Sequence, residues 1–352
     1  MKAEARGRMT KTAVILFNLG GPDSPEAVEG FLYNLFKDPA IISVPNPLRW
    51  FLAKMISKRR APLAREIYEH IGGSSPLLQQ TIAQGHDLQK ELSNPDDGKT
   101  LGDVKCFVAM RYWHPFADDV AREVKNWGAD KVILLPLYPQ FSTTTTGSSV
   151  KDWHRVARKK GLSVSTKLVC CYPDHRNFIK SHLTLLQEAL ATVPEGADVR
   201  ILFSAHGLPK KVIDKGDPYQ QQVEATVKAI VSQLDEGIDH VVCYQSKVGP
   251  LEWIGPSTED EICRAGRENK AVVIVPVAFV SEHSETLVEL DIEYKELAEE
   301  NGVKTYIRVP ALGTEKHYIE GLADLVRKRF HNTNERSFFC DPQTKCCLAE
   351  RS

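Results

Sequence analysis

The chain has 352 residues, of which 42% are hydrophobic and 26% charged, and its formal net charge is -1. This composition predicts a globular protein with room for two domains, and the balanced charge argues against nucleic acid as a partner. Residues 1–10 are polar and basic and no apolar run reaches about 18 residues, so we expect neither a secretory signal nor a transmembrane helix.

Buried strands alternate with amphipathic helices along the chain. In the first half we expect strands at 12–19, 104–110 and 131–139 and helices at 24–34, 117–127 and 150–160. In the second half we expect strands at 163–170, 198–204, 240–245 and 271–279 and a closing helix at 318–330. The alternation is typical of βαβ units and parallel sheets. We therefore predict two similar α/β domains, 12–155 and 156–330, with a disordered stretch at 1–11 and a cysteine-bearing extension at 331–352.

Residues 41–60 form an apolar segment that is broken by Pro45 and Pro47 and followed by basic residues. One interpretation is a buried loop and helix. The other is an exposed apolar lip that lies in a membrane interface beside anionic head groups. The segment itself does not decide between the two.

A histidine stands at the end of the strand expected at 198–204. Gly207 and Pro209 stop that strand, so His206 is held at its carboxyl end, where open α/β sheets place their ligands. Imidazole accepts or releases a proton near neutral pH, which favours a role in proton transfer. The alternative is a structural histidine that hydrogen-bonds a loop.

A run of acids follows the strand expected at 271–279. Ser281 is a good helix N-cap, and four glutamates then recur at spacings of three, four and four. These are Glu282, Glu285, Glu289 and Glu293. On one helix face without basic partners they repel each other, unless they face water or cations. Because the stripe begins at a strand end beside His283, we favour a proton relay or a divalent-metal site over a solvated helix face.

Eight motifs, taken together and in order, resemble those of the ferrochelatases. They are NLGGP (18–22), IGGSSP (71–76), RYWHP (111–115), LPLYP (135–139), FSAHGLP (203–209), QSKVGP (245–250), WIGP (253–256), and HSET (283–286) with ELDIEY (289–294). Each motif alone is weak, but eight in order with similar spacing are very specific, and the resemblance extends from residue 12 to residue 330.

The resemblance implies an enzyme that inserts Fe²⁺ into protoporphyrin IX in the last step of haem synthesis. The implied fold is two Rossmann-like domains, each a parallel sheet flanked by helices, with a porphyrin cleft between them. His206 matches the catalytic histidine and Glu285 the acid opposite it, and both would contact the Fe²⁺ substrate. His283, Glu289 and Glu293 complete the implied catalytic set, and whether the acids conduct protons or deliver iron stays open.

The resemblance also implies how the porphyrin is held. Leu19, Tyr112 and Trp253 look like residues of the porphyrin wall. Arg111 and Ser75 suit the propionates, because guanidinium and hydroxyl groups both bind carboxylate. Residues 38–60 match the membrane-facing lip of the family, which favours the interfacial interpretation of that segment.

Eight cysteines in a chain without a secretory signal predict reduced thiols or metal ligands rather than disulfides. Cys340, Cys346 and Cys347 crowd into the tail, where a frayed terminus is the alternative to a set of thiolate ligands. Some ferrochelatases carry a 2Fe–2S cluster held by three C-terminal cysteines and one from mid-chain, and the resemblance implies such a cluster here. Zinc is the alternative occupant.

The fourth cluster ligand is not fixed by the resemblance, because Ser181 stands where animal-type enzymes have that cysteine. We expect Cys170 or Cys171, since both lie at a strand end; strand alternation would put them on opposite faces, so that only one ligates. The other cysteines are expected to be core thiols. These are Cys106, Cys243 and Cys263.

Two alternatives to a protoporphyrin ferrochelatase remain. One is a chelatase for coproporphyrin or another tetrapyrrole, although an apolar lip favours the less polar protoporphyrin. The other is a non-catalytic porphyrin carrier, which would not need both His206 and the acids. We expect a cytoplasmic protein that is peripherally associated with the inner face of the membrane, and the sequence leaves a homodimer open.

Overall fold

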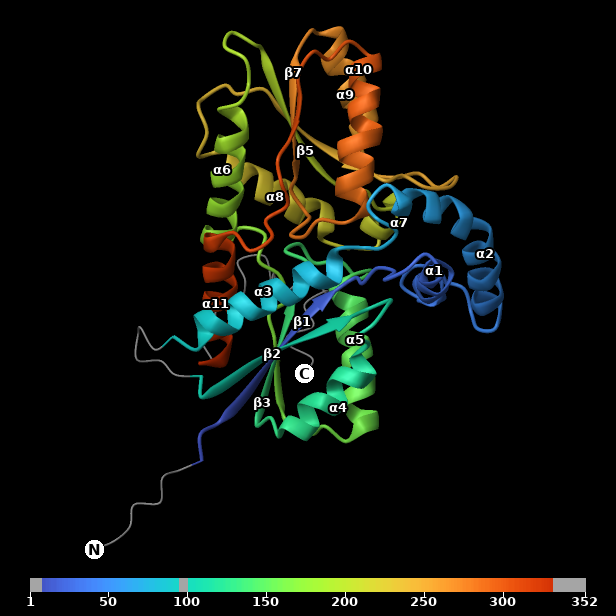
Figure 1. The fold of residues 1–352 in the computed structure, drawn as a ribbon, viewed down its shortest axis with the longest axis vertical. Helices are drawn as coiled ribbons and strands as arrows, with labels where there is room; N and C mark the ends of the chain where they lie inside the picture. The colour runs from blue at the N-terminus through green and yellow to red at the C-terminus, as the bar shows by residue number, and fades with distance from the viewer. Residues whose placement is uncertain (1–7, 95–100, 332–352) are drawn as a thin grey trace, which may run out of the picture.

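The computed structural model describes residues 8–94 and 101–331 (Figure 1). Within these residues lie two four-stranded parallel sheets, one in each half of the chain. The first contains β1 (Lys11–Asn18), β2 (Asp103–Met110), β3 (Lys131–Pro136) and β4 (Ser165–Leu168). The second contains β5 (Val199–His206), β6 (His240–Gln245), β7 (Ala271–Pro276) and β8 (Tyr306–Arg308). The predicted disordered N-terminus and cysteine-bearing extension fall mostly outside the described residues.

The two sheets repeat one topology. The strand order is β2-β1-β3-β4 in the first and β6-β5-β7-β8 in the second. In each sheet the strand that comes first in the chain, β1 or β5, therefore lies in the interior of the sheet and not at its edge. Because all pairs are parallel, the carboxyl ends gather at one edge of each sheet. This confirms the predicted α/β class with two Rossmann-like halves.

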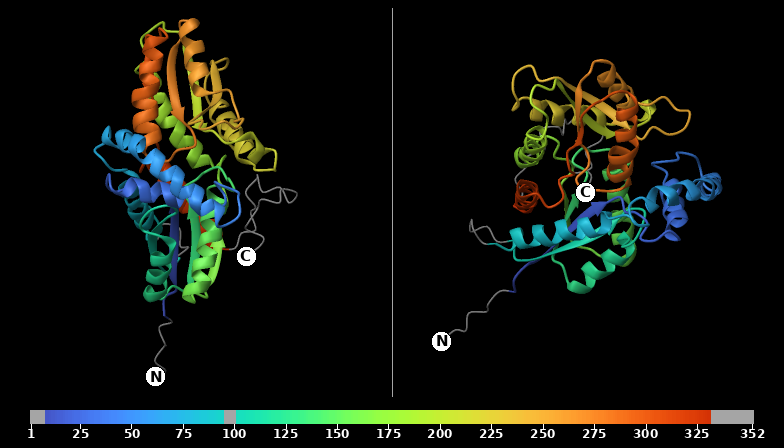
Figure 2. Two further views of the ribbon diagram at one scale, coloured as in Figure 1. Left: turned by 90° about the vertical axis from the view of Figure 1, so that its right-hand side faces the viewer. Right: turned by 45° about the horizontal axis from the view of Figure 1, so that its top comes forward.

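Helices cover both faces of each sheet, as Figures 1 and 2 show. In the first half they are α1 (Ala27–Lys37), α2 (Leu48–Glu69), α3 (Leu77–Leu92), α4 (Ala117–Trp127) and α5 (Thr146–Lys160). In the second they are α6 (Arg176–Leu190), α7 (Lys210–Ile213), α8 (Tyr219–Val231), α9 (Thr258–Arg267), the π-helix η1 (Glu285–Glu293), α10 (Tyr294–Glu300) and α11 (Lys316–Phe330).

Side chains that point alternately to the two faces of each central strand divide the apolar core into separate clusters. On β1, Ala13 and Ile15 face α4 and α5, whereas Val14 and Leu16 join a cluster that also holds Phe203 of β5. That second cluster extends through α6, α8 and α11, so one continuous apolar core joins the two halves. Strands buried on both faces read as unbroken apolar runs, which is why they could be predicted from the sequence.

The strand expected at 163–170 is the main correction to the fold. It is shorter, and β4 pairs in parallel with β3, from Lys131 opposite Ser165 to Leu134 opposite Leu168. It therefore belongs to the first sheet and not to the second. The sequence shows where a strand lies but not which edge it joins, because pairing is decided by distant contacts. The three-residue β8 is too short to produce a recognisable pattern.

The last helix returns to the first half of the molecule. Arg327 Nη2 of α11 donates to the carbonyl of Glu91 at the end of α3, at 2.8 Å. Arg329 Nε donates to the carbonyl of Leu168 at the end of β4, at 2.6 Å. The predicted closing helix thus packs against both halves, and its last turn lies beside the end of β4.

Candidate active site

The carboxyl edge of the second sheet carries the candidate site. His206 is the last residue of β5, and its register partner on β6 is Gln245. The next residue, Ser246, has φ 63°, a left-handed conformation that is uncommon for a residue with a side chain and is often found at functional sites. This turn directs groups from the end of β6 toward the segment that follows β7.

Glu285 pairs with His206. Nδ1 of His206 lies 2.9 Å from Oε2 of Glu285, and the two side chains are 38% and 27% exposed. Burial would lower the pKa of His206, but the charge and the hydrogen bond of Glu285 outweigh it and raise the pKa. Burial would raise the pKa of Glu285, yet the charge and hydrogen bond of His206 lower it to about 2. The pair is therefore ionised in this arrangement.

Glu289 lies one turn further along, among hydrogen-bond donors. It accepts from Gln245 Nε2 at 2.9 Å, Ser246 N at 2.9 Å, Ser246 Oγ at 2.5 Å and Tyr294 Oη at 3.1 Å. Burial and the charge of Glu285 nevertheless raise its pKa to about 7. A carboxyl group with a pKa near neutrality can take up and release protons. Gln245 and Ser246 are not among the residues predicted for the site, although both stand in the motif QSKVGP.

The acids are carried by a π-helix and not by the expected α-helix. The prediction that a helix starts after an N-cap at Ser281 is wrong: η1 begins at Glu285, and Ser281 Oγ donates to Gln84 Oε1 at 3.2 Å. In a π-helix each backbone hydrogen bond spans one residue more than in an α-helix, and such turns are frequent at functional sites. Glu285 and Glu289 are partly buried and Glu293 is exposed, so the row of acids runs from the interior to the surface of the protein.

Glu282 does not belong to this row of acids. Its Oε1 accepts from Arg308 Nη1 at 2.7 Å and from the Ala311 amide at 2.9 Å. The expectation of a stripe without basic partners is therefore wrong for Glu282. Arg308 lies on β8, the strand that the sequence pattern does not reveal, so its partner could not be inferred.

His283 stands next to the pair without joining it. Its Nε2 is 4.0 Å from Oε2 of Glu285, and its Nδ1 has no hydrogen-bond partner in the described part of the chain. Burial is the largest influence and lowers the pKa of His283. A neutral imidazole beside a charged one can accept a proton that the charged one cannot.

Trp253 packs at the edge of His206. The two ring centroids are 6.3 Å apart with the ring planes at 72°. Gly207 makes this possible, because a Cβ there would come within 3.1 Å of Trp253 Cε3 and of the Gln245 carbonyl. The indole thus forms an apolar surface directly beside the imidazole, and its contact with porphyrin stays a prediction.

In the first half, Arg111 and Tyr112 belong to a buried network around Asp38. Arg111 Nη2 donates to Asp38 Oδ2 at 2.6 Å and Arg111 Nε donates to Ser148 Oγ at 2.7 Å. The Tyr112 hydroxyl donates to the same Asp38 oxygen at 3.0 Å, and Tyr112 is fully buried. Asp38 is not among the residues predicted from the sequence. The porphyrin contacts expected of Arg111 and Tyr112 stay predictions.

Leu19 and Ser75 lie close to this network. The Leu19 carbonyl accepts from the Tyr112 amide at 2.9 Å, and the side chain of Leu19 is half-buried. Ser75 is buried, and its amide donates to the Pro22 carbonyl at 2.8 Å. The glycine loops at 20–21 and 72–73 therefore meet at the carboxyl edge of the first sheet, which places both predicted residues at one edge.

The segment at 41–60 is exposed and not buried. Its helix α2 buries the small residues Ala53 and Ser57, while Trp50 is 50% and Phe51 66% exposed. Arg49 orders the preceding loop by donating to the Lys37 carbonyl at 2.9 Å and the Val44 carbonyl at 2.7 Å. The interpretation as a buried loop and helix is therefore wrong. Among the described residues, no helix combines the length and apolar character needed to cross a bilayer.

The two candidate cluster cysteines follow β4 directly. Because the strand ends at Leu168, alternation no longer applies, and Cys170 and Cys171 pack into the same apolar cluster rather than onto opposite faces. Cys171 Sγ accepts from Gln222 Nε2 at 3.5 Å. Cys340, Cys346 and Cys347 lie outside the described residues. Within residues 8–94 and 101–331, no three His, Cys, Asp or Glu side chains are grouped to hold a metal ion.

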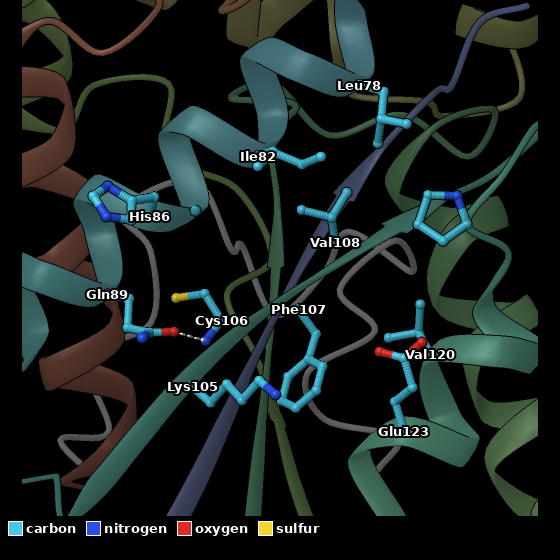
Figure 3. Close-up of a pocket in the computed structure, with 12 residues that line it drawn as sticks. Leu78, Ile82, His86, Gln89, Lys105, Cys106, Phe107, Val108, Val120 and Glu123 are labelled. Carbon is cyan, nitrogen blue, oxygen red and sulfur yellow. Dashed lines mark hydrogen bonds between the residues drawn. The ribbon is translucent and has the colours of Figure 1, made fainter. Parts of the chain in front are cut away.

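A groove of about 520 Å³ lies elsewhere, at the outer edge of the first sheet between α3, β2 and α4 (Figure 3). Apolar side chains such as Ile82 and Val108 line it, and Gln89 Oε1 accepts from the Cys106 amide on β2 at 2.9 Å. None of the residues predicted for catalysis or porphyrin binding lines this groove, so it is separate from His206 and Glu285.

Similarity to solved structures agrees with the fold. SirB from Bacillus subtilis, solved with Fe³⁺, superposes with a TM-score of 0.54 over 94% of this chain and 99% of that one, at 11% identity. The sirohydrochlorin chelatase SirB from subspecies spizizenii, in complex with cobalt, gives 0.51 over the same shares at 10% identity. At such low identity these matches establish the chelatase-type architecture alone.

Sequence relatives define the family. The chain is 52% identical to a ferrochelatase of Pelagibacter ubique over 320 residues, 91% of each protein. It is 54% identical to one of Caulobacter vibrioides over 317 residues, 90% of each, and 50% identical to one of Rickettsia bellii over 329 residues, 93% of this chain and 89% of the relative. The ferrochelatase family model matches residues 11–330. The chain therefore belongs to the ferrochelatase family, in agreement with its eight motifs and its fold.

Proposed function

We propose that this protein inserts Fe²⁺ into protoporphyrin IX to form haem, with His206 and Glu285 at the reacting centre. Family membership supplies the reaction. The observation that carries the assignment of residues is the ion pair of His206 and Glu285, 2.9 Å apart at a strand end and beside the indole of Trp253. A carrier that only binds porphyrin has no use for such a pair.

The chemistry requires two protons to leave. Free-base porphyrin has two pyrrole N–H groups, and one Fe²⁺ replaces both protons, so two protons are released per haem. The ring is flat and stiff, and binding energy has to bend it to expose the nitrogen lone pairs. Once the proton of His206 has passed to the acids, its imidazole can accept a pyrrole proton.

The row of acids gives these protons a route to solvent. Glu289, with its pKa raised to about 7, can accept a proton near neutral pH and pass it toward the exposed Glu293. The same imidazole nitrogen and carboxylate oxygens also suit ferrous iron as it arrives. We therefore place the first contacts of the Fe²⁺ substrate at His206 and Glu285.

The porphyrin is proposed to lie between the two halves of the molecule. Trp253 would contact one part of the macrocycle and Leu19 another, with the fully buried Tyr112 packed behind Leu19. Arg111 and Ser75 would hold the propionates from the carboxyl edge of the first sheet. The partly exposed guanidinium of Arg111 would then join the porphyrin to the Asp38 network.

Residues 38–60 are proposed to rest on a membrane surface. Exposed apolar side chains alternate with basic ones along α2, a composition suited to an anionic interface. A second exposed apolar pair, Val248 and Leu251, lies in the loop that connects Gln245 at the end of β6 to Trp253. An apolar substrate could then pass from the bilayer to the site without crossing water.

A 2Fe–2S cluster is proposed as a resident cofactor, with ligands Cys340, Cys346 and Cys347 and one of Cys170 and Cys171. The support in the described structure is proximity. The last turn of α11 is fixed to the end of β4, since Lys167 Nζ donates to the Arg329 carbonyl at 3.2 Å and to the Phe330 carbonyl at 3.1 Å. The tail therefore leaves the body close to Cys170.

Replacing His206 tests the proposed reaction. We expect His206→Ala to lower the rate of haem formation from Fe²⁺ and protoporphyrin IX by at least about 100-fold, the usual scale of a lost general base. Fluorescence of bound porphyrin should show binding within a few-fold of wild type. The matched control His240→Ala, at the exposed far end of β6, should keep full activity.

Two results would count against the proposal. If folded, porphyrin-binding His206→Ala forms haem at a near wild-type rate, the proton-acceptor role is wrong. If the wild-type protein prefers coproporphyrin when both porphyrins are offered, the substrate is wrong although the chemistry stands.

A further inference from the structure

Two glutamines on α3 reach across from the first half of the molecule to the segment just before the catalytic acids. In Figure 1, α3 crosses the middle of the molecule between the two sheets. Gln80 and Gln84 are four residues apart, so their side chains lie on one face of this helix. Neither is predicted from the sequence, and neither belongs to the proposed reaction centre.

Gln84 is completely buried and uses its whole amide. Its Nε2 donates to the Val280 carbonyl at 2.7 Å and the Gly313 carbonyl at 2.9 Å, and its Oε1 accepts from Ser281 Oγ at 3.2 Å. One side chain thus joins two loops of the second half. Two carbonyl partners on the nitrogen leave the orientation of the amide unambiguous.

Gln80 extends the contact by one residue. Its Oε1 accepts from the Glu282 amide at 2.7 Å. The side chain of Glu282 in turn is held by Arg308 and the Ala311 amide. Residues 280–282 are therefore fixed on both sides immediately before His283 and Glu285.

The same helix turn also holds the first half's part of the site. Thr81, between the two glutamines, accepts from Asn18 Nδ2 at 3.0 Å through its Oγ1. Asn18 Oδ1 accepts from the Leu19 amide at 2.8 Å. One turn of α3 therefore connects Leu19 to the segment that leads into Glu285.

We propose that Gln80 and Gln84 are positioning residues for iron insertion: they hold residues 280–282 against α3 and so set where Glu285 lies relative to Leu19. The proposal rests on the proposed role of Glu285. Without Gln84, the Gly313 carbonyl and the Ser281 hydroxyl lose their partners in a buried place, which is costly enough to shift the loop. A shift below 1 Å is sufficient to slow a reaction that depends on alignment.

A purely structural role makes a different prediction, and a second set of contacts between the halves provides the comparison. Gln140 Nε2 donates to Thr226 Oγ1 of α8 at 3.0 Å, and Thr226 Oγ1 donates to the Pro173 carbonyl at 2.7 Å. Both residues are buried. Thr226→Val removes buried hydrogen bonds between the halves without involving residues 280–285.

The experiment compares Gln84→Met and Gln80→Met with Thr226→Val, each also in a Glu285→Gln background. Methionine keeps the length of glutamine and removes its hydrogen bonds. We expect Gln84→Met and Gln80→Met to lower kcat about tenfold with the KM for porphyrin within twofold of wild type. Thr226→Val should lower the thermal midpoint and leave kcat unchanged. In the Glu285→Gln background, neither glutamine variant should lower kcat further.

Three outcomes would overturn the proposal. The first is an unchanged kcat in folded Gln84→Met or Gln80→Met, the second a raised porphyrin KM in place of a lowered kcat, and the third a full additional loss in the Glu285→Gln background. Because Gln80 is only half-buried, Gln80→Met provides the test if Gln84→Met does not fold. If Glu285→Gln alone has wild-type activity, the proposed role of Glu285 has failed instead.

Discussion

His182 is an unusual residue in the core, and its chemistry ties the stability of the fold to pH. It lies in α6 with its ring centroid 4.8 Å from that of Phe178, and it is 2% exposed. Its Nε2 has no hydrogen-bond partner among the described residues. Burial lowers its pKa from the usual 6.5 to about 3, so the folded protein keeps it neutral.

The sign of the effect follows from this shift. The pKa is lower in the folded state than in the unfolded state, so between pH 6.5 and about 3 only the unfolded chain binds the proton. Above pH 6.5 His182 is neutral in both the folded and the unfolded chain, so its protonation does not destabilise the fold. As the pH falls below 6.5, protonation of the unfolded chain lowers the free energy of unfolding by about 1.4 kcal/mol per pH unit.

Denaturant unfolding at pH 7 and pH 5 measures this contribution. Between pH 7 and pH 5 we expect the wild type to lose about 2 kcal/mol more stability than His182→Leu does, whatever the effect of the substitution at pH 7. His86→Gln, an exposed histidine on α3, is the matched control and should lose as much as the wild type. An equal loss in His182→Leu would show that His182 is not the residue responsible.

At the level of single residues, the sequence indicates candidates for the chemistry but not their partners. His206 could be singled out because it ends a strand, and Glu285 because it lies in the segment after the next buried strand, where ligands are expected; their catalytic roles stay predictions. Ser246 could not, because its contact with Glu289 depends on a left-handed backbone that no pattern announces. Asp38 could not either, since its partner Arg111 is 73 residues away in the chain.

Among the elements, α2 carries the feature that most needs an external partner. Four large apolar side chains project from its first half, while the residues that this half buries, Ala53 and Ser57, are small. The exposed four are Leu48, Trp50, Phe51 and Met55. Exposed apolar surface of this kind marks an interaction site.

We expect the double variant Trp50→Ser with Phe51→Ser to bind vesicles of phosphatidylglycerol and phosphatidylcholine about tenfold or more weakly than wild type. The reason is the transfer free energy of two aromatic side chains that no longer leave water. Co-sedimentation measures the binding. The double variant Leu63→Ser with Ile82→Ser removes exposed apolar groups outside residues 38–60 and should bind like wild type. Equal binding of both variants would contradict the membrane assignment.

The elements differ in how far their sequence determines them. The strands buried on both faces and the amphipathic α4 could be predicted, because each needs only a local pattern. The π-helix could not, since the spacing of its glutamates in the sequence also fits an α-helix and the difference lies in the backbone hydrogen bonds. The sheet to which β4 belongs could not, because its pairing with β3 is a long-range choice.

For the molecule as a whole, the return of α11 to the first half is the observation that bears on the fourth ligand of the proposed cluster. The Arg329–Leu168 hydrogen bond of 2.6 Å holds the end of α11 within two residues of Cys170. Burial raises the pKa of the Cys106 and Cys243 thiols to about 12, which disfavours the thiolate that a cluster requires. Location therefore favours Cys170 or Cys171, and protonation argues against Cys106 and Cys243.

Chemical analysis of the whole chain tests this assignment. We expect one of Cys170→Ser and Cys171→Ser to lose iron and acid-labile sulfide together with the visible absorption of the cluster, because a cluster that needs four ligands is not held firmly by three thiolates. Cys243→Ser, in the completely buried interior of the second half, should keep both. Full cluster content in both tested variants would move the fourth ligand to another cysteine. Bound zinc without sulfide in the wild type would replace the proposed cluster by a tetrahedral thiolate site.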